Sequence, residues 1–313
     1  MKRVLITGAN GFIGKVLVGR FAVDGDWAVR AGVRHPTRMP DGVDCVPYGD
    51  IRHVDSWAPY LEGVDAVVHL ANQAHVMGRN VGLADYRAAN VDPLQRLVRD
   101  AAEAGVRRLV YLSSIKALGE RTPPGRPLRA DSPSAPEDDY GRSKQEAEQV
   151  LAAAARGTAL QTVVIRPPLV YGPDAPGNFS RLVRWVAIGF PLPLGAVNGN
   201  RRSLIGVDNL VDLIVTCLEH PTAVNRTFLA SDGEDVSTAE LLRRIASVMG
   251  RPARLVPVPV GMLRVGARLA GRGEVAGRLL DSLQVDDSDA RDVLDWKPPL
   301  SLDEGLRRAV GNG

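Results

Sequence analysis

The sequence has few aromatic residues, only a small excess of basic over acidic residues, and no long apolar run. Aromatic side chains make up 5% of the 313 residues, and 39 basic side chains are nearly balanced by 36 acidic ones. Nucleic-acid surfaces need clustered basic residues with stacking rings, so we expect no nucleic-acid partner. No stretch reaches the ~18 apolar residues of a membrane span. The apolar run within Met1–Ile6 is too short for a signal peptide, and we expect a cytoplasmic protein.

Cysteine is equally scarce. The only two, Cys45 and Cys217, lie far apart in apolar stretches. We therefore predict two buried structural thiols in a reducing compartment, with neither a disulfide nor a metal site.

Short apolar runs alternate with helical patterns in the first half of the chain. The predicted strands cover 4–6, 28–33, 43–46, 66–70, 109–112 and 162–165, and the predicted helices cover 11–24, 83–104 and 139–155. This alternation predicts an α/β fold of the Rossmann type, with a doubly wound parallel sheet. We expect residues 1–170 to form the dinucleotide-binding domain, with later crossover segments around 203–230. The Pro- and Gly-rich remainder, 171–313, predicts a smaller C-terminal α/β lobe.

A glycine-rich segment follows the first strand and opens the first helix. Its spacing is G-x-x-G-x-x-G, from Gly8 through Gly11 to Gly14. Glycine at these positions lets a phosphate approach the backbone N–H groups at a helix N-terminus. The residues predicted to contact the cofactor here are Gly8, Asn10, Gly11, Phe12, Ile13 and Gly14.

The second predicted strand should end beside the adenosine ribose. Sites for NAD usually place an acid there, whereas this chain has Gly32 with Arg34 just beyond. A missing acid and a nearby arginine favour a 2′-phosphate, and hence NADP(H), with NAD(H) as the alternative. Asp50 and Ile51, after the third strand, are predicted to lie against the adenine.

Ser113 and Ser114 close the fifth strand, at the sheet edge where ligands bind in open α/β folds. Tyr140 and Lys144 are four residues apart and share one helix face. We expect the lysine to lower the pKa of the tyrosine toward the working range. With Ser114, the pair would then handle the proton of a carbinol oxygen while hydride passes at the carbon.

Together these motifs resemble, in order and over nearly the whole chain, the extended short-chain dehydrogenase/reductases of the NAD-dependent epimerase/dehydratase family. The matching segments are Thr7–Gly14, Asp50–Ile51, His69–Ala71, Asn90, Ser114, Tyr140 with Lys144, and Arg166–Gly172.

The resemblance implies specific roles for several residues. It makes Ser114 and Tyr140 catalytic, the latter as acid/base, and it makes Lys144 a catalytic residue that also binds the nicotinamide ribose. It implies that Asn90 orders the site and that the backbone at Pro167 meets the nicotinamide carboxamide. The remaining cofactor contacts that it implies are at Leu70, Ala71 and Ser113.

The second lobe resembles those that bind nucleotide sugars. Asn178 corresponds to a substrate-binding asparagine, and Arg202 is similar to the arginine that holds the diphosphate, a role that suits a forked guanidinium. Arg278 and Ser114 are further candidate substrate contacts.

Two reactions stay open. Ile115 and Lys116 stand where sugar-nucleotide dehydratases have an Asp-Glu pair, which argues against dehydration. The chain most resembles UDP-4-keto-6-deoxy-N-acetylhexosamine 4-reductases, a subgroup often labelled UDP-glucose 4-epimerase. The alternative is a UDP-sugar 4-epimerase with tightly bound NAD. A non-catalytic NADP(H) sensor is the remote third possibility, because such proteins typically lack the Tyr–Lys pair. The family also implies a homodimer, through helices near 83–104 and 139–155.

Overall fold

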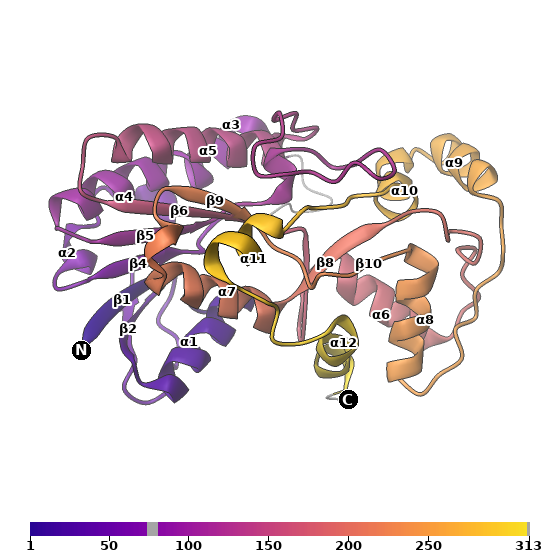
Figure 1. Ribbon diagram of the computed structural model, residues 1–313, viewed down its shortest axis with the longest axis horizontal. Coiled ribbons are helices and arrows are strands. Elements are labelled where there is room, and N and C mark those ends of the chain that lie inside the picture. Colours follow the sequence, from indigo (N-terminus) through magenta and orange to yellow (C-terminus); the bar gives the residue numbers. More distant parts are fainter. Residues whose placement is uncertain (74–80, 312–313) are drawn as a thin grey trace.

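The computed structural model describes residues 1–73 and 81–311. A seven-stranded, wholly parallel sheet has the order β3-β2-β1-β4-β5-β6-β9 (Figure 1). Its strands are β1 Lys2–Thr7, β2 Trp27–Val33, β3 Asp44–Pro47, β4 Ala66–His69, β5 Arg108–Leu112, β6 Gln161–Arg166 and β9 Arg226–Leu229. The predicted Rossmann-type α/β fold is confirmed.

Helices cover both faces of this sheet, with α3, α4 and α5 on one side and α1 and α7 on the other (Figure 1). The helices around the large sheet are α1 Phe12–Asp24, α2 Ala58–Leu61, α3 Leu83–Asn90, α4 Asp92–Glu103, α5 Asp139–Ala155, α7 Val207–Glu219 and α11 Ser288–Leu294. Three short 3-10 turns, η1 Ile51–His53, η2 Ile115–Ala117 and η3 Pro221–Ala223, lie between them.

Successive side chains of the central strands enter different hydrophobic cores. Val4 and Ile6 pack in the core under α1 and α7, and Leu5 packs in the core under α4 and α5. Because side chains alternate along a strand, a strand buried on both faces reads as a continuous apolar run. This explains why the sheet was visible in the sequence.

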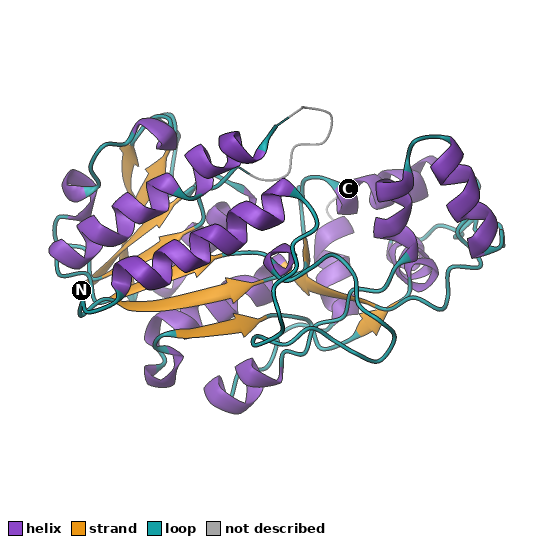
Figure 2. Cartoon of the chain, turned by 90° about the horizontal axis from the view of Figure 1, so that it is seen from above, coloured by secondary structure: helices purple, strands orange, loops and turns teal. Residues whose placement is uncertain are grey.

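The single helix predicted over 83–104 is wrong. Two helices, α3 and α4, are separated at Val91, and Pro93 lies in the first turn of α4. Proline has no N–H and its ring clashes with the preceding turn, so a continuous helix through residue 93 is disfavoured. The two helices still pack against α5, and long helices lie side by side over the strands in Figure 2.

The remaining elements build around a second, three-stranded sheet of order β10-β8-β7 and a core of their own. Its strands are β7 Leu169–Tyr171, β8 Arg202–Gly206 and β10 Asp235–Val236, and its helices are α6 Asn178–Ile188, α8 Thr238–Val248, α9 Val260–Leu269, α10 Gly273–Leu280 and α12 Leu302–Val310. Of the segments around 203–230, β8 joins this small sheet, whereas α7 and β9 return to the large one.

The prediction of two buried thiols holds only for Cys217. Both cysteines are free, but Cys45 is only partly buried because β3 is the edge strand of the large sheet. Within the described residues, no helix is long and apolar enough to cross a membrane.

Candidate active site

The glycine segment forms a tight cradle at the start of α1. Gly8 has a φ of 70°, and a Cβ there would lie 2.9 Å from the backbone nitrogen of Ala71. A Cβ on Gly14 would lie 2.3 Å from the Gly8 carbonyl oxygen. Gly11 caps the helix without any side-chain hydrogen bond. The N-terminus of α1 therefore offers backbone N–H groups on a surface that only glycine permits, which fits a pyrophosphate.

The neighbouring predicted contacts lie around this cradle. Phe12 and Ile13 are partly buried in the first turn of α1, and Asn10 donates to the Thr37 hydroxyl at 3.4 Å. Leu70 and Ala71 end the run that follows β4, against Gly8.

At the predicted adenosine end of the cradle, two arginines pair with one carboxylate. Asp50 accepts from Arg52 at 2.5 Å and from Arg34 at 3.2 Å. The guanidinium of Arg52, aided by Arg34, holds the pKa of Asp50 well below its usual range. Gly32 leaves room for the ring of Tyr48, which a Cβ would approach to 3.2 Å. Arg52 was not singled out from the sequence, since nothing in its spacing shows that it folds back onto Asp50. Ile51, the residue after Asp50, begins η1 and is partly buried against the core under α4 and α5.

Lys144 is fully buried on α5 and points at the end of β5. Its Nζ donates to the Leu112 carbonyl at 2.9 Å and to the Tyr111 hydroxyl at 3.1 Å, and it lies 4.8 Å from the centre of the Tyr111 ring. Tyr111 stacks on His69, which contacts the Thr7 hydroxyl at 2.8 Å. The lysine thus sits in a buried polar row that crosses the carboxyl ends of three strands.

The expected lowering of the Tyr140 pKa by Lys144 is wrong for this structure. Burial raises the pKa of Tyr140 above its usual value, and a hydrogen bond with Ser114 opposes that rise. Lys144 instead donates hydrogen bonds to Tyr111 and Leu112, and its Nζ lies 6.0 Å from the centre of the Tyr140 ring. The three predicted catalytic side chains are nevertheless gathered at one edge of the sheet.

Asn90 ties α3 to the start of α5, which carries Tyr140. Its side chain accepts from the Gln73 N–H at 2.7 Å and donates to the Ser143 hydroxyl at 3.1 Å. Ser143 in turn donates to the carbonyl of Tyr140 at 2.8 Å. Asn90 is therefore placed to order the backbone that carries Tyr140.

The two serines after β5 have different surroundings. The Ser113 hydroxyl donates to Glu148, which also binds Arg166 at 2.6 Å. Ser114 is partly exposed and caps η2 by accepting from the Lys116 N–H at 3.3 Å. The following residue, Ile115, donates its N–H to the Pro167 carbonyl at 3.0 Å. Ser114, and not Ser113, faces the Tyr140 hydroxyl.

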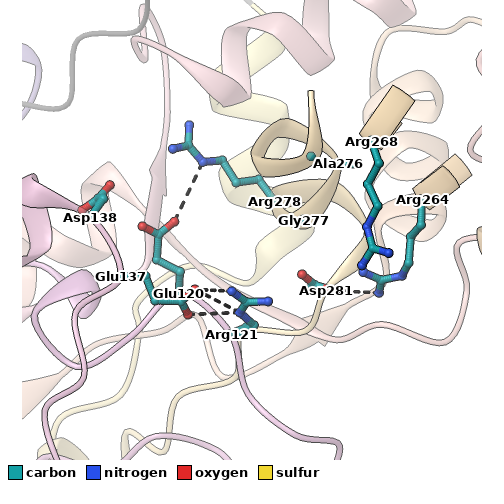
Figure 3. Close-up of a pocket in the computed structure, with 11 residues that line it drawn as sticks. Glu120, Arg121, Glu137, Asp138, Arg264, Arg268, Ala276, Gly277, Arg278 and Asp281 are labelled. Carbon is teal, nitrogen blue, oxygen red and sulfur yellow. Dashed lines mark hydrogen bonds and ion pairs between the residues drawn. The ribbon is translucent and has the colours of Figure 1, made fainter. Parts of the chain in front are cut away.

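A cavity of about 390 Å³ opens beside this site, between the loop after η2 and the α9–α10 helices (Figure 3). Arg264 pairs with Asp281 at 2.6 Å, and Arg121 pairs with Glu137. The charged residues that line the cavity are Glu120, Arg121, Glu137, Asp138, Arg264, Arg268, Arg278 and Asp281.

The predicted substrate residues are only partly brought together. Arg278 lines the cavity, and its Nε lies 3.9 Å from Glu120. Arg202 does not line it, but donates to the Asp281 carbonyl at 3.0 Å, and burial lowers its pKa. Asn178 begins α6 and is not among the lining residues. The missed charged members, Glu120, Arg121, Glu137, Arg264, Arg268 and Asp281, carry no local pattern. Their segments meet only in the folded chain.

Replacing Lys144 with methionine should change how stability depends on pH. Burial lowers the pKa of Lys144 from 10.5 to about 7. Above the folded pKa the unfolded chain binds one more proton than the folded chain, so wild-type stability should rise with pH through this window. Between the folded and unfolded pKa values of Lys144, the unfolding free energy of the wild type should rise relative to that of Lys144→Met by up to about 1.4 kcal/mol per pH unit. Below both pKa values the difference between the two proteins should not change with pH.

Urea unfolding of both proteins across this range measures the difference. A difference in unfolding free energy that stays constant with pH would contradict the buried, weakly basic lysine.

Comparisons with known proteins agree with this geometry. The profile of the NAD dependent epimerase/dehydratase family matches residues 4–230. A UDP-glucose 4-epimerase of Vibrio cholerae is 42% identical over 311 residues, covering 99% of this chain and 94% of that protein. A UDP-glucose 4-epimerase of Mycolicibacterium smegmatis is 30% identical over 98% of this chain and 97% of its own.

Among solved structures, MoeE5 in complex with UDP-glucuronic acid and NAD is similar throughout. It superposes with a TM-score of 0.79 at 27% identity, covering 99% of this chain and 98% of its own. The glycine cradle, the Ser–Tyr–Lys side chains and these matches lead to one conclusion. The chain is an extended short-chain dehydrogenase/reductase and belongs to the NAD dependent epimerase/dehydratase family.

Proposed function

We propose that the protein reduces a UDP-4-keto-6-deoxy-N-acetylhexosamine at C4, with NADPH as the hydride source and Tyr140 as the acid. The observation that carries this proposal is the adenosine end of the cofactor site. Arg34 and Arg52 converge there on Asp50, and Gly32 stands near the position usual for an acid. Two guanidinium groups suit a 2′-phosphate. A net reductase needs an exchangeable reduced cofactor, which NADPH provides.

The side chains at the sheet edge divide the remaining work. The bound nicotinamide supplies the hydride at C4. Ser114 donates to the C4 oxygen and holds it beside Tyr140, whose hydroxyl delivers the proton. The high pKa of Tyr140 keeps that hydroxyl protonated before the transfer. Lys144 turns from Tyr111 to bind the nicotinamide ribose.

The cavity supplies the substrate site in this proposal. Arg278 holds the diphosphate from the cavity wall, while Arg202 and Asn178, which lie outside the cavity lining, contact the substrate beyond it. A nucleotide-sugar substrate is supported by the UDP-glucuronic acid in the MoeE5 complex. Residues 1–170 then serve the cofactor and residues 171–313 mainly serve the nucleotide sugar.

A UDP-sugar 4-epimerase with tightly held NAD is the second candidate. It is favoured by the names of the two curated relatives above, at 42% and 30% identity. An epimerase returns the hydride to the same sugar and leaves no net change in cofactor.

Two parallel reactions separate the candidates. Purified protein is mixed with UDP-4-keto-6-deoxy-GlcNAc and NADPH in one, and with UDP-glucose or UDP-GlcNAc alone in the other. The reductase consumes NADPH in proportion to the sugar in the first mixture and leaves the second unchanged. Sugar interconversion without added cofactor would overturn the reductase in favour of the epimerase.

Replacing Arg34 with alanine should weaken the preference for NADPH. Its guanidinium is well exposed, with 61% of the side chain accessible, and it faces the proposed 2′-phosphate. Loss of one charged hydrogen bond predicts a kcat/KM for NADPH that falls about tenfold more than that for NADH. Arg20→Ala, which removes an exposed arginine on α1, is the control. Equal loss with both cofactors would contradict the assignment.

A homodimer through the segments near 83–104 and 139–155, which form α3, α4 and α5, is also part of the proposal. These helices pack side by side on one face of the large sheet. Sedimentation of the purified protein measures the assembly, and a monomer at assay concentration would contradict it.

A further inference from the structure

A chain of alternating charges runs from the cavity to the catalytic helix. Its central member is Lys116, in η2 directly after Ser114. Lys116 Nζ lies 2.9 Å from Glu120 Oε1 and 2.5 Å from Asp138 Oδ2. All three side chains are only 18–23% exposed, so these contacts are shielded from solvent more than surface pairs are.

One end of the chain holds the N-terminus of α5. Asp138 Oδ1 accepts from the Gly141 N–H at 2.7 Å, which caps the first turn of the helix. A Cβ on Gly141 would lie 2.5 Å from the Lys116 carbonyl oxygen, so η2 packs directly on this turn. Tyr140 lies between Asp138 and Gly141 in this first turn. The placement of the proposed acid therefore depends on Asp138, and Asp138 contacts Lys116.

The other end of the chain faces the cavity. Glu120 lines it and places Oε2 3.9 Å from Arg278 Nε (Figure 3). Glu120 is thus shared between Lys116 and the arginine that the proposed function assigns to the diphosphate. A diphosphate and Glu120 compete for the same guanidinium.

We propose that Glu120 and Lys116 are positioning residues that couple diphosphate binding at Arg278 to the setting of Tyr140. This inference rests on the proposed nucleotide-sugar function. A bound diphosphate takes Arg278 away from Glu120, and Glu120 is then left to Lys116 and to Asp138, with which it also shares a hydrogen bond. With Glu120 holding it more firmly, Lys116 fixes Asp138 as the N-cap of α5. The capped first turn then holds the Tyr140 hydroxyl beside the sugar.

The two residues should respond differently to substitution. Glu120→Gln removes the competitor of the diphosphate and one anchor of Lys116. It should lower the Kd for UDP about two- to fivefold, the size of a modest ion pair, while kcat falls about tenfold. Lys116→Met leaves the cavity lining intact but frees Glu120 for Arg278, so it should lower kcat similarly and raise the Kd for UDP. Lys116→Arg keeps the cation and should restore most of the turnover.

Calorimetric titration with UDP and steady-state turnover measure this split. Glu234→Gln, which removes the acid of an exposed pair with Arg244, is the matched control and should alter neither quantity. A merely structural role for Glu120 would weaken UDP binding together with turnover. Tighter UDP binding with slower turnover therefore supports the coupling.

The failures of the two proposals are distinguishable. If the wild-type protein binds UDP and Glu120→Gln leaves either its Kd or kcat unchanged, the coupling is overturned and the proposed function stands. If the wild-type protein does not bind UDP at all, the nucleotide-sugar function falls, and the coupling falls with it.

Discussion

Replacing Tyr140 with phenylalanine is expected to lower turnover about a hundred- to ten-thousandfold, the usual contribution of a positioned general acid. The change removes the hydroxyl that faces Ser114 and keeps the ring that packs edge-on against Tyr86 at 5.8 Å between centres. The fold and the cofactor site should therefore survive. Steady-state turnover with nucleotide sugar, together with cofactor titration by fluorescence, measures the two consequences separately.

A matched control tests whether any lost hydroxyl has this effect. Tyr60 also packs in an aromatic cluster, against Trp57 and Tyr48, but lies in α2, away from Ser114. Tyr60→Phe should keep wild-type turnover. If Tyr140→Phe retained undiminished turnover, the acid–base assignment would be wrong, and the sensor reading of this fold would gain support.

The second large effect is expected at the glycine cradle. Gly14→Ala would place a methyl group 2.3 Å from the Gly8 carbonyl oxygen and 2.8 Å from the backbone of Ala9. Both obstacles are backbone, so relief requires the loop to move away from α1. The strain is expected to reduce stability by about 1–3 kcal/mol, and the displaced N–H groups should weaken cofactor binding at least about a hundredfold.

Gly19 provides the control on the same helix. A Cβ there meets nothing within 4 Å. Gly19→Ala should stabilise the protein by about 0.5–1 kcal/mol, because alanine is the better helix former, and should leave cofactor affinity unchanged. Thermal unfolding and cofactor titration of both variants provide the comparison. Equal cofactor affinity in Gly14→Ala and Gly19→Ala would show that the cradle does not hold the pyrophosphate.

The parts of the fold that could be predicted from the sequence are those encoded locally. Continuous apolar runs predict strands buried on both faces and mark five of the seven strands of the large sheet, and a short apolar run also marks the partly buried edge strand β3. The glycine spacing and the Tyr140–Lys144 pair are also local. In the structure the glycine segment follows β1, and the Tyr140–Lys144 pair lies at the start of α5, as predicted.

The parts that could not be predicted depend on contacts between distant segments. β9 contributes only four residues to the large sheet, and its neighbour β6 lies some 60 residues earlier. The cavity joins Glu120 and Arg121 to Arg264 and Arg268, and no spacing rule connects segments so far apart. The partner of Lys144 was missed for the same reason, because only the register of β5 under α5 brings Tyr111 to its ammonium.

Hydride tracing tests the central claim most directly. NADPH carrying deuterium at the transferable position of its nicotinamide is incubated with UDP-4-keto-6-deoxy-GlcNAc and the protein, and the product sugar is analysed by NMR. Deuterium found at C4, one atom for each NADPH consumed, is the result predicted for a C4 reductase with an exchangeable cofactor. Product that carries no deuterium at C4, or NADPH that remains unconsumed while UDP-glucose is interconverted in a parallel sample, would contradict it.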